Sequence, residues 1–232
     1  KAFSTDGWDK PSRAAAARLA EAPEQMFPTD PTETSATLGG MAACNASGAR
    51  SYRYGAMRDH VRALRLVLAD GDFQGVRRSA RGACRARGRT LELTTEGGRR
   101  MCVQLPAYQM PHAKNASGYF AADDMDAVDL VIGSDGTLGV ISELELGLMP
   151  APAVIWGVSC FFAREDQAVE ATVAARGRLR HAAALEYFDP AALDILRRAR
   201  AAGSAFAALP ELPASFGCCL FVEIQAPSED EA

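Results

Sequence analysis

The sequence has little lysine and no strong excess of either charge. Lys1, Lys10 and Lys114 are its only lysines, and arginine supplies the rest of the 25 basic residues against 29 acidic ones, a net charge of −4. Such a balance excludes a general attraction to nucleic acid. The sequence also has no apolar run as long as a membrane span and no recognisable signal peptide. Its 232 residues suffice for one large domain or two small ones.

Metal-binding and hydrolytic motifs are missing as well. The six cysteines include the adjacent pair at 218 and 219 but no Cys-x-x-Cys, which argues against a zinc site or an iron–sulfur cluster held by this chain alone. Reduced thiols, as in a cytosolic protein, are therefore expected. His60, His112 and His181 share no ligand spacing, and no Gly-x-Ser-x-Gly accompanies them. Only His112, in a predicted loop, is a candidate to face a ligand. We expect His60 in a strand and His181 at the end of a strand or helix.

What the chain does have is a glycine-rich segment, VIGSDGTLGVISELELGLM, at residues 131–149. The apolar run Leu130–Ile132 predicts a short buried strand. A second strand is predicted to begin at Val140, because the residues that follow alternate between a buried face and a partly solvated face. Glycines 133, 136 and 139 lie between the strands and permit positive φ and a close approach to a phosphate or the edge of a nucleotide. A strand follows them, so this is not the Rossmann fingerprint, and a hairpin without a ligand is the alternative.

A second segment, TLGGMAACNASG, at residues 37–48, is made almost entirely of small residues. A flat, rigid cofactor can lie against such a low surface, although tight core packing would use the same residues. Asn45 is its one amide side chain, able both to donate and to accept hydrogen bonds. Met41–Ala46 predicts a short helix whose first N–H groups face the ligand. The basic cluster that follows suits either a phosphate contact or a solvated loop; it consists of Arg50, Arg53 and Arg58.

Periodicity and turn signals predict the remaining elements. The first part of the chain is predicted to contain a helix over 10–21, a strand over 60–69 closed by a turn at 70–71, an irregular surface segment over 74–89, a hairpin of 91–95 with 100–105, a loop over 106–118 and a short helix within 123–129. Pro150 and Pro152 mark a domain boundary. Beyond it we predict strand 154–162, helix 165–179, strand 182–188, a helix from 190 to about 202 and strand 219–224, which together indicate an α+β sheet.

These segments together resemble the FAD-linked oxidases of the vanillyl-alcohol oxidase type. GSDGTLGVISELELGLMPAP is similar to the family's Gly-Ser-Glu-Gly-Thr-Leu-Gly segment, and TLGGMAACNASGARSYRYGAMRDHV is similar to its Thr-Ile-Gly-Gly segment, which ends in Arg-Asp. KNASGY at residues 114–119 is similar to a third family string. The resemblance is greatest to the branch of glycolate oxidase flavin subunits, D-lactate dehydrogenases and D-2-hydroxyglutarate dehydrogenases.

The resemblance implies an α+β fold in two domains. Residues 1–150 would be the second subdomain of an FAD-binding PCMH-type domain, and residues 151–232 the start of a ferredoxin-like α+β cap domain. Family members also carry an upstream half-domain with a pyrophosphate loop, and downstream histidines and an acidic residue at the substrate site. We therefore expect the chain to be an interior fragment of a longer protein, with its catalytic base and metal ligands beyond Ala232.

The resemblance also implies a set of FAD-binding residues. The isoalloxazine and pyrophosphate side would be lined by Gly39, Gly40, Cys44, Asn45 and Gly48, with Tyr54 and Gly55 close behind. The adenine and ribose end would be approached by Gly136, Thr137, Gly139, Val140 and Ile141. Cys44 departs from the common Thr of the family and Asp135 from the usual Glu. No residue is a convincing site for a covalent flavin link, and no metal ligand is assigned within the chain.

The function implied by the resemblance is oxidation of a D-2-hydroxy acid such as lactate, glycolate or 2-hydroxyglutarate, with hydride transfer from Cα to flavin N5. The electron acceptor would be a protein, a quinone or oxygen. The chain could also form a homodimer. The expected location is the cytoplasm or the periphery of the inner membrane. Two alternatives remain: a nucleotide- or anion-binding module without a redox role, and a degenerate flavoprotein domain that only mediates assembly.

Overall fold

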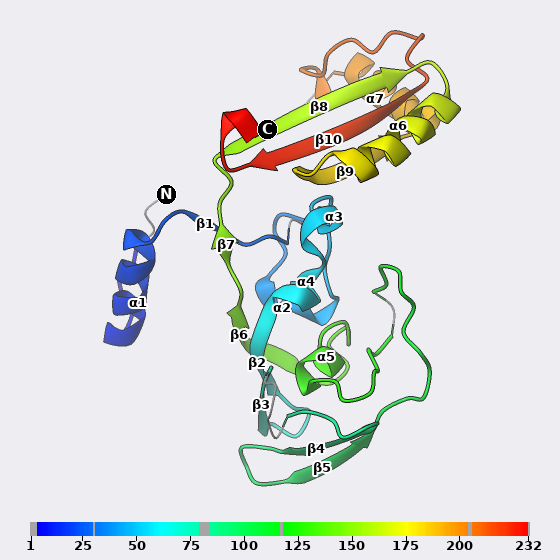
Figure 1. The fold of residues 1–232 in the computed structure, drawn as a ribbon. Helices are drawn as coiled ribbons and strands as arrows, with labels where there is room; N and C mark the ends of the chain where they lie inside the picture. Colours follow the sequence, from blue (N-terminus) through cyan, green and yellow to red (C-terminus); the bar gives the residue numbers. More distant parts are fainter. Residues whose placement is uncertain (1–3, 30, 79–83, 117, 204–205, 232) are drawn as a thin grey trace.

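The computed structural model describes residues 4–29, 31–78, 84–116, 118–203 and 206–231. These residues form two parts, joined at residues 151–153 and drawn one above the other in Figure 1. The elements of the lower, first part are α1 (Lys10–Glu21), β1 (Gln25–Met26), α2 (Leu38–Ala43), α3 (Ser51–Tyr54), α4 (Met57–His60), β2 (Val61–Val67), β3 (Phe73–Arg77), β4 (Thr90–Thr94), β5 (Arg100–Gln104), α5 (Ala127–Val131), β6 (Val140–Leu146) and β7 (Met149–Pro150). The elements of the second part are β8 (Val154–Phe162), α6 (Glu165–Arg178), β9 (Ala182–Phe188), α7 (Pro190–Ala201), β10 (Cys218–Ala226) and η2 (Glu229–Glu231). None of the helices in these described ranges is long and apolar enough to cross a membrane.

An antiparallel sheet of order β3-β2-β6 forms the centre of the first part. β2 makes a hairpin with β3 around the turn predicted at residues 70–71, and its other edge pairs with β6 from far downstream. Leu64 and Leu66 of β2 lie in one buried cluster with Val128 of α5 and Met41 of α2. This cluster packs α2 and α5 against the sheet, so that two segments distant in sequence become neighbours. The β4–β5 hairpin also forms where the sequence predicts it.

The strand β6 is present as predicted, but its alternation is interrupted. Its register with β2 skips Ser142, which is a β-bulge. A bulge of this kind inserts an extra residue and reverses which side chains face the core. Val140 is consequently 70% exposed, while Ile141 packs against the core. The alternation in the sequence instead predicts a buried Val140 and an exposed Ile141, because the alternation of apolar and polar residues does not reveal a bulge.

The predicted strand Leu130–Ile132 is wrong, because Ala127–Val131 forms the helix α5. The N–H of Ile132 donates to the carbonyl oxygen of Val128 over 3.1 Å and so closes a helical turn. Val131 and Ile132 are buried all the same. A short apolar run can be buried in a strand or in a helix, and periodicity does not separate the two.

Smaller differences concern α2, His60 and β3. α2 begins at Leu38 rather than Met41, because Thr37 Oγ1 accepts the N–H of Gly40 (3.1 Å) as an N-cap. His60 is the last residue of α4 and not a strand residue. β3 occupies part of the segment predicted to be irregular, and residues 79–83 of that segment lie outside the described residues.

The second part has the predicted order of strands and helices. β10 lies between β8 and β9, and both pairs are antiparallel. Ala171 and Ala175 of α6 pack with Leu220 and Val222 of β10. Leu193 of α7 lines a cavity with side chains of the other face of β10, so the two helices contact opposite faces of the sheet. A complete ferredoxin-like cap stays a prediction, as does the domain boundary at residue 150.

Candidate functional site

The two glycine-containing segments predicted to form one ligand surface lie against each other. The N–H of Gly133 donates to the carbonyl oxygen of Ala42 (3.1 Å), and the N–H of Asp135 donates to that of Ala43 (2.8 Å). A Cβ on Gly39 would come within 3.1 Å of the carbonyl oxygen of Ile141. α2 therefore packs closely on the turn that precedes β6, and larger residues at these contacts would separate the two segments.

The third segment, residues 114–119, reaches the same turn. The hydroxyl oxygens of Tyr119 and Thr137 are 2.7 Å apart. Because Thr137 Oγ1 donates to the carbonyl oxygen of Ser134 (2.6 Å), Tyr119 is the donor of this bond. Ser117 of the segment lies outside the described residues. Three stretches that are far apart in sequence thus meet at one place.

The glycines of the turn have the backbone conformation that the sequence predicts. Their φ values are +84° at Gly133, +76° at Gly136 and +151° at Gly139. A Cβ on Gly139 would lie 2.6 Å from the carbonyl oxygen of Val67, so this glycine allows β2 and the turn to approach. A Cβ on Gly136 would meet nothing within 4 Å. Of the three, Gly136 alone has both a glycine conformation and open space in front of it.

The remaining predicted cofactor glycines have contacts within the chain. A Cβ on Gly40 would come within 3.1 Å of the capping oxygen of Thr37, and one on Gly55 would overlap the Asp59 carboxylate. The N–H of Gly48 donates to Ser51 Oγ (3.0 Å). Tight packing, the alternative left open for residues 37–48, therefore accounts for Gly39 and Gly40.

An exposed strip nevertheless crosses both segments. Its residues are exposed while their neighbours Met41 and Asn45 are buried; they are Gly40, Cys44, Gly136, Thr137 and Val140. The thiol of Cys44 donates to the carbonyl oxygen of Gly40 (3.0 Å), which holds it along the helix. The side chains of this strip are small or flat enough to leave a low surface.

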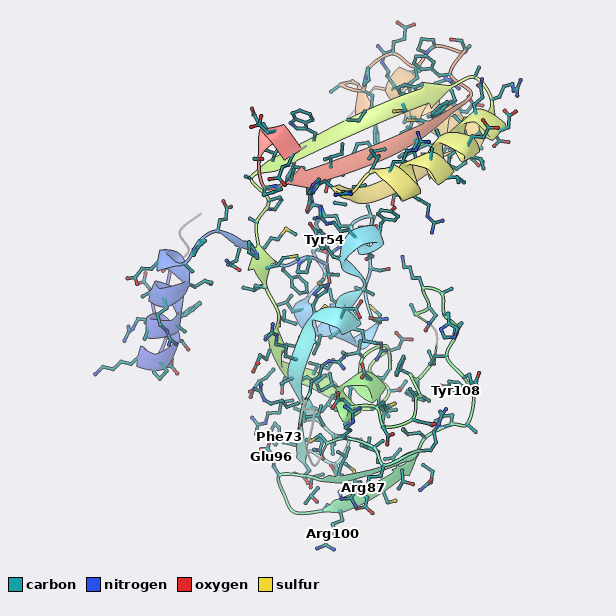
Figure 2. All side chains as sticks on the ribbon, in the orientation of Figure 1. Tyr54, Phe73, Arg87, Glu96, Arg100 and Tyr108 are labelled. Carbon is teal, nitrogen blue, oxygen red and sulfur yellow. The ribbon has the colours of Figure 1, made fainter. Side chains whose placement is uncertain are left out.

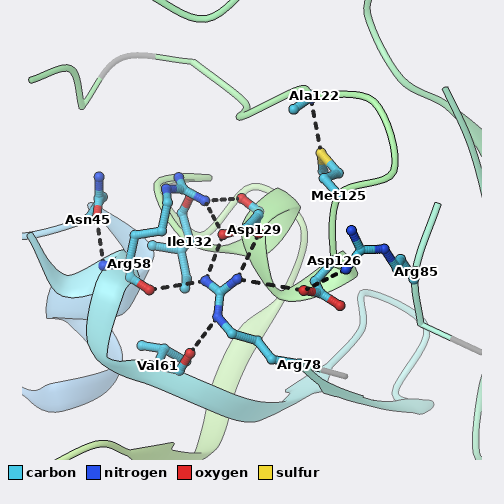
Figure 3. Close-up of polar contacts among 10 residues, drawn as sticks. All are labelled: Asn45, Arg58, Val61, Arg78, Arg85, Ala122, Met125, Asp126, Asp129 and Ile132. Carbon is cyan, nitrogen blue, oxygen red and sulfur yellow. Dashed lines mark hydrogen bonds and ion pairs between the residues drawn. The ribbon is translucent and has the colours of Figure 1, made fainter. Parts of the chain in front are cut away.

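Arg58 links these segments through hydrogen bonds to Asn45, Asp129 and Ile132 (Figure 3). Its guanidinium donates to the backbone oxygens of Asp129 and Ile132 at 2.5 Å each, and to Asp129 Oδ1 at 3.2 Å. Its own N–H donates to Asn45 Oδ1 (3.0 Å). The ring of Phe120 lies 4.4 Å from the Arg58 guanidinium carbon. Arg58 thus contacts the small-residue segment, the start of the glycine turn and the residue that follows the third segment.

A second arginine shares the same carboxylate. Arg78 donates to Asp129 at 2.6 Å and 2.8 Å, and to the carbonyl oxygen of Arg58 at 3.0 Å. Burial lowers the pKa of Arg58, whereas hydrogen bonds to Asp129 raise the pKa of the less buried Arg78. Both guanidinium groups stay charged at neutral pH, since arginine is not deprotonated in proteins. Asp129 is only 8% exposed, so the site is held together by a buried carboxylate between two cations.

This network was not predicted from the sequence. Neither alternative for the basic cluster describes Arg58, which contacts buried protein groups rather than a phosphate or solvent. The signal that could have found it is Asp129 itself, a carboxylate inside the apolar run AVDLV. A charged side chain among buried apolar ones needs a partner of opposite charge.

Tyr54 and the other two arginines of the cluster point to the second part of the chain. Figure 2 shows Tyr54 at the junction, where its hydroxyl donates to Gln225 Oε1 over 2.6 Å. Arg50 Nε donates to Glu223 Oε1 (2.7 Å), and Arg53 Nη1 to the carbonyl oxygen of Gln225 (2.8 Å). The hydroxyl of Tyr54 is therefore directed at β10 rather than at the exposed strip.

A cavity of about 300 Å³ lies between α3, α4 and the loop around residue 114. Its lining includes Asn45 and Gly55, which the resemblance assigns to the cofactor, and Lys114 and Asn115 of the third segment. Arg58 also lines it. His112 is exposed and does not line this cavity. The described residues contain no group of three His, Cys, Asp or Glu side chains arranged to hold a metal ion.

Comparisons with known proteins show what the chain is similar to. Residues 13–77 match the family described as FAD binding domain. The chain is 35% identical over 136 residues to a D-lactate dehydrogenase from Anaerostipes hadrus, over 59% of this chain and 21% of that protein. It is 26% identical over 213 residues to glycolate oxidase subunit GlcD from Bacillus subtilis, over 91% of this chain and 36% of that protein.

A solved structure shows the same fold. Alkyldihydroxyacetonephosphate synthase matches with a TM-score of 0.55 at 18% identity, over 93% of this chain and 35% of that chain. The chain spans about a fifth of the D-lactate dehydrogenase and about a third of the other two proteins. The predicted relation to this branch of FAD-linked enzymes is confirmed as distant homology.

Proposed function

We propose that the chain is the flavin-facing part of an FAD-linked oxidoreductase that oxidises a D-2-hydroxy acid. The observation that carries this proposal is the meeting of the three segments. The N–H groups of Gly133 and Asp135 bond to the end of α2, and Tyr119 bonds to Thr137 of the same turn. These contacts bring residues predicted to bind FAD, from both segments, onto one exposed strip.

The residues of this strip fit a flat cofactor. Gly40 and Cys44 on one side, and Gly136, Thr137 and Val140 on the other, are exposed and offer no bulky polar side chain. Gly136 has open space where a Cβ would stand. We propose that Gly39–Gly48 hold the isoalloxazine side and Gly136–Ile141 the adenine side. The bound flavin would supply the hydride acceptor, and the chain would supply its position.

The substrate class is proposed from the relatives. Their names include D-lactate dehydrogenase, glycolate oxidase and D-2-hydroxyglutarate dehydrogenase, whose substrates are all small 2-hydroxy acids. The cavity beside Asn45 lies at the lower end of the size range of small-molecule sites, about 300 to 1,000 Å³, and carries several polar groups. A general base must accept the hydroxyl proton. No histidine lines this cavity, and we propose that another part of the full-length enzyme supplies the base.

The proposal is tested by the visible spectrum of the protein after gel filtration with added FAD. A retained flavin band is expected, and loss of that band on addition of a D-2-hydroxy acid to the full-length protein would support the redox role. Retained flavin that no 2-hydroxy acid bleaches would favour a nucleotide-binding module without redox function. Absence of flavin from the full-length protein would contradict the proposal.

Gly136→Trp should weaken FAD binding by about tenfold or more, because an indole would fill the open space in front of the turn. The measurement is the dissociation constant from flavin fluorescence. Gly71→Trp is the matched control, since Gly71 has φ +85° and equally open space but lies in the β2–β3 turn. Both variants carry similar backbone strain, so only the site variant should lose affinity. Equal FAD affinities of the two variants would show that the flavin does not bind against Gly136.

A further inference from the structure

The short helix α3 and the residue before it hold the two parts of the chain together. Arg50 makes two hydrogen bonds to the Glu223 carboxylate, at 2.7 Å and 3.1 Å. The side chains of this pair are 26% and 16% exposed, so the pair is shielded more than an ordinary surface salt bridge. The hydrogen bond from Arg50 lowers the pKa of Glu223, which keeps the carboxylate charged at neutral pH. The contact therefore joins the loop that follows the small-residue segment directly to β10.

Gln225, a buried residue of β10, adds hydrogen bonds to the same contact between the two parts. It is 1% exposed, accepts the Tyr54 hydroxyl at Oε1 and donates from Nε2 to Glu223 Oε1 (2.7 Å). Arg53 adds bonds to the carbonyl oxygens of His181 (3.3 Å) and Gln225 (2.8 Å). The partly buried hydrogen bonds to Gln225 are costly to leave unmade, so they fix the position of β10 on α3.

The same segment also forms part of the wall of the cavity beside Asn45. Ser51 and Gly55, which directly follow Arg50 and Tyr54 in sequence, line the cavity together with Asn45. Ser51 Oγ also accepts the N–H of Gly48, which keeps the loop before α3 closed. A shift of α3 would thus change the cavity and the contact with β10 at the same time.

We propose that Arg50 and Tyr54 are positioning residues, which set the shape of the cavity beside Asn45 by fixing α3 to the second part of the chain. This inference rests on the proposed function in one respect, namely that the cavity receives a small 2-hydroxy acid. The contact with Glu223 and Gln225 keeps the wall formed by Ser51 and Gly55 in place. The second part therefore shapes the cavity through α3 without contributing a lining residue to it.

The test is hydrogen–deuterium exchange of the whole 232-residue chain carrying Glu223→Gln. Weakening one shielded ion pair by about 1 kcal/mol corresponds to a roughly fivefold change in a local opening equilibrium. We expect amide exchange over residues 48–55 to rise by about that factor, and exchange in the β4–β5 hairpin to stay unchanged. Glu145→Gln, which breaks the exposed pair of Arg77 and Glu145, is the matched control and should leave residues 48–55 unaffected.

The charge-swapped double variant Arg50→Glu, Glu223→Arg should restore slow exchange over residues 48–55, which distinguishes the pair from a general packing effect. Unchanged exchange in Glu223→Gln, or a rise across the whole chain, would overturn the inference. In full-length enzyme, Glu223→Gln should raise the KM for D-lactate while leaving FAD affinity unchanged. An unchanged KM would show that the Arg50–Glu223 pair has a structural role only, and would overturn the positioning role. Absence of FAD from the wild-type enzyme would instead contradict the proposed function, since the exchange measurement needs no flavin.

Discussion

Asp129→Ala should lower the free energy of unfolding by about 3–5 kcal/mol, the cost of breaking a buried ion pair by removing one partner. The carboxylate accepts from Arg58 and Arg78 and is 8% exposed. Its loss would leave two guanidinium groups facing each other, one of them with a side chain only 16% exposed. Urea unfolding followed by circular dichroism measures the change.

The matched control for this prediction is Asp123→Ala. Asp123 also pairs with an arginine, Arg89, but its side chain is 70% exposed. Exposed pairs contribute about 0–1 kcal/mol, so this variant should remain close to the wild type. Asp129→Asn should lie between the two, because the amide keeps the size of the side chain and one acceptor oxygen but loses the charge. A loss below about 1 kcal/mol in Asp129→Ala would show that the two arginines find other partners.

Gly139→Ala should destabilise the chain by about 2–4 kcal/mol, from backbone strain and from overpacking together. The new Cβ would lie 2.6 Å from the carbonyl oxygen of Val67, an atom of β2 that cannot move without disturbing the sheet. The φ of +151° adds a conformation that alanine rarely adopts. Thermal unfolding measures the shift.

Gly98→Ala is the control for this second prediction. Gly98 has φ +87°, and a Cβ at this position would meet no atom within 4 Å, so the variant carries strain without the clash. Its destabilisation should be about 1 kcal/mol. Equal effects at both positions would show that strain alone governs Gly139 and that β2 and the turn can separate at little cost.

The sequence was sufficient to predict features that depend on neighbouring residues. Strand β8 occupies the predicted residues 154–162, and the helix α7 begins at Pro190 after the N-cap Asp189, as its local signals indicate. Gly133, Gly136 and Gly139 have the positive φ values that glycines in a turn permit. In each case the sequence signal lies within a few residues, even where the contacts of the element are distant, as in the pairing of β8 with β10.

Features that depend on distant residues were missed. Leu130–Ile132 was predicted as a strand because nothing nearby distinguishes a buried strand from the helix α5. The bulge at Ser142 arises from the pairing of β6 with β2, which alternation along β6 alone does not reveal. Arg58 was assigned to a phosphate or to solvent because its partners, Asp129 and Ile132, lie far downstream. The residue-by-residue assignment of FAD contacts stays a prediction.

The pairing of β2 with β6 sets an order on the assembly of the first part during synthesis. The strands of the hairpins β2–β3 and β4–β5 are close in sequence and can pair early. Val61 of β2 can pair with Leu146 of β6 only after β6 has been synthesised. Contacts between such distant residues form slowly, because a long loop has to close before they bring any stabilisation. Until β6 emerges, one edge of β2 has no partner strand and is open to association with other chains. The glycine turn directly precedes β6, so the surface proposed for FAD would be among the last features of this part to form, and a chain interrupted before residue 140 would expose β2 without acquiring that surface.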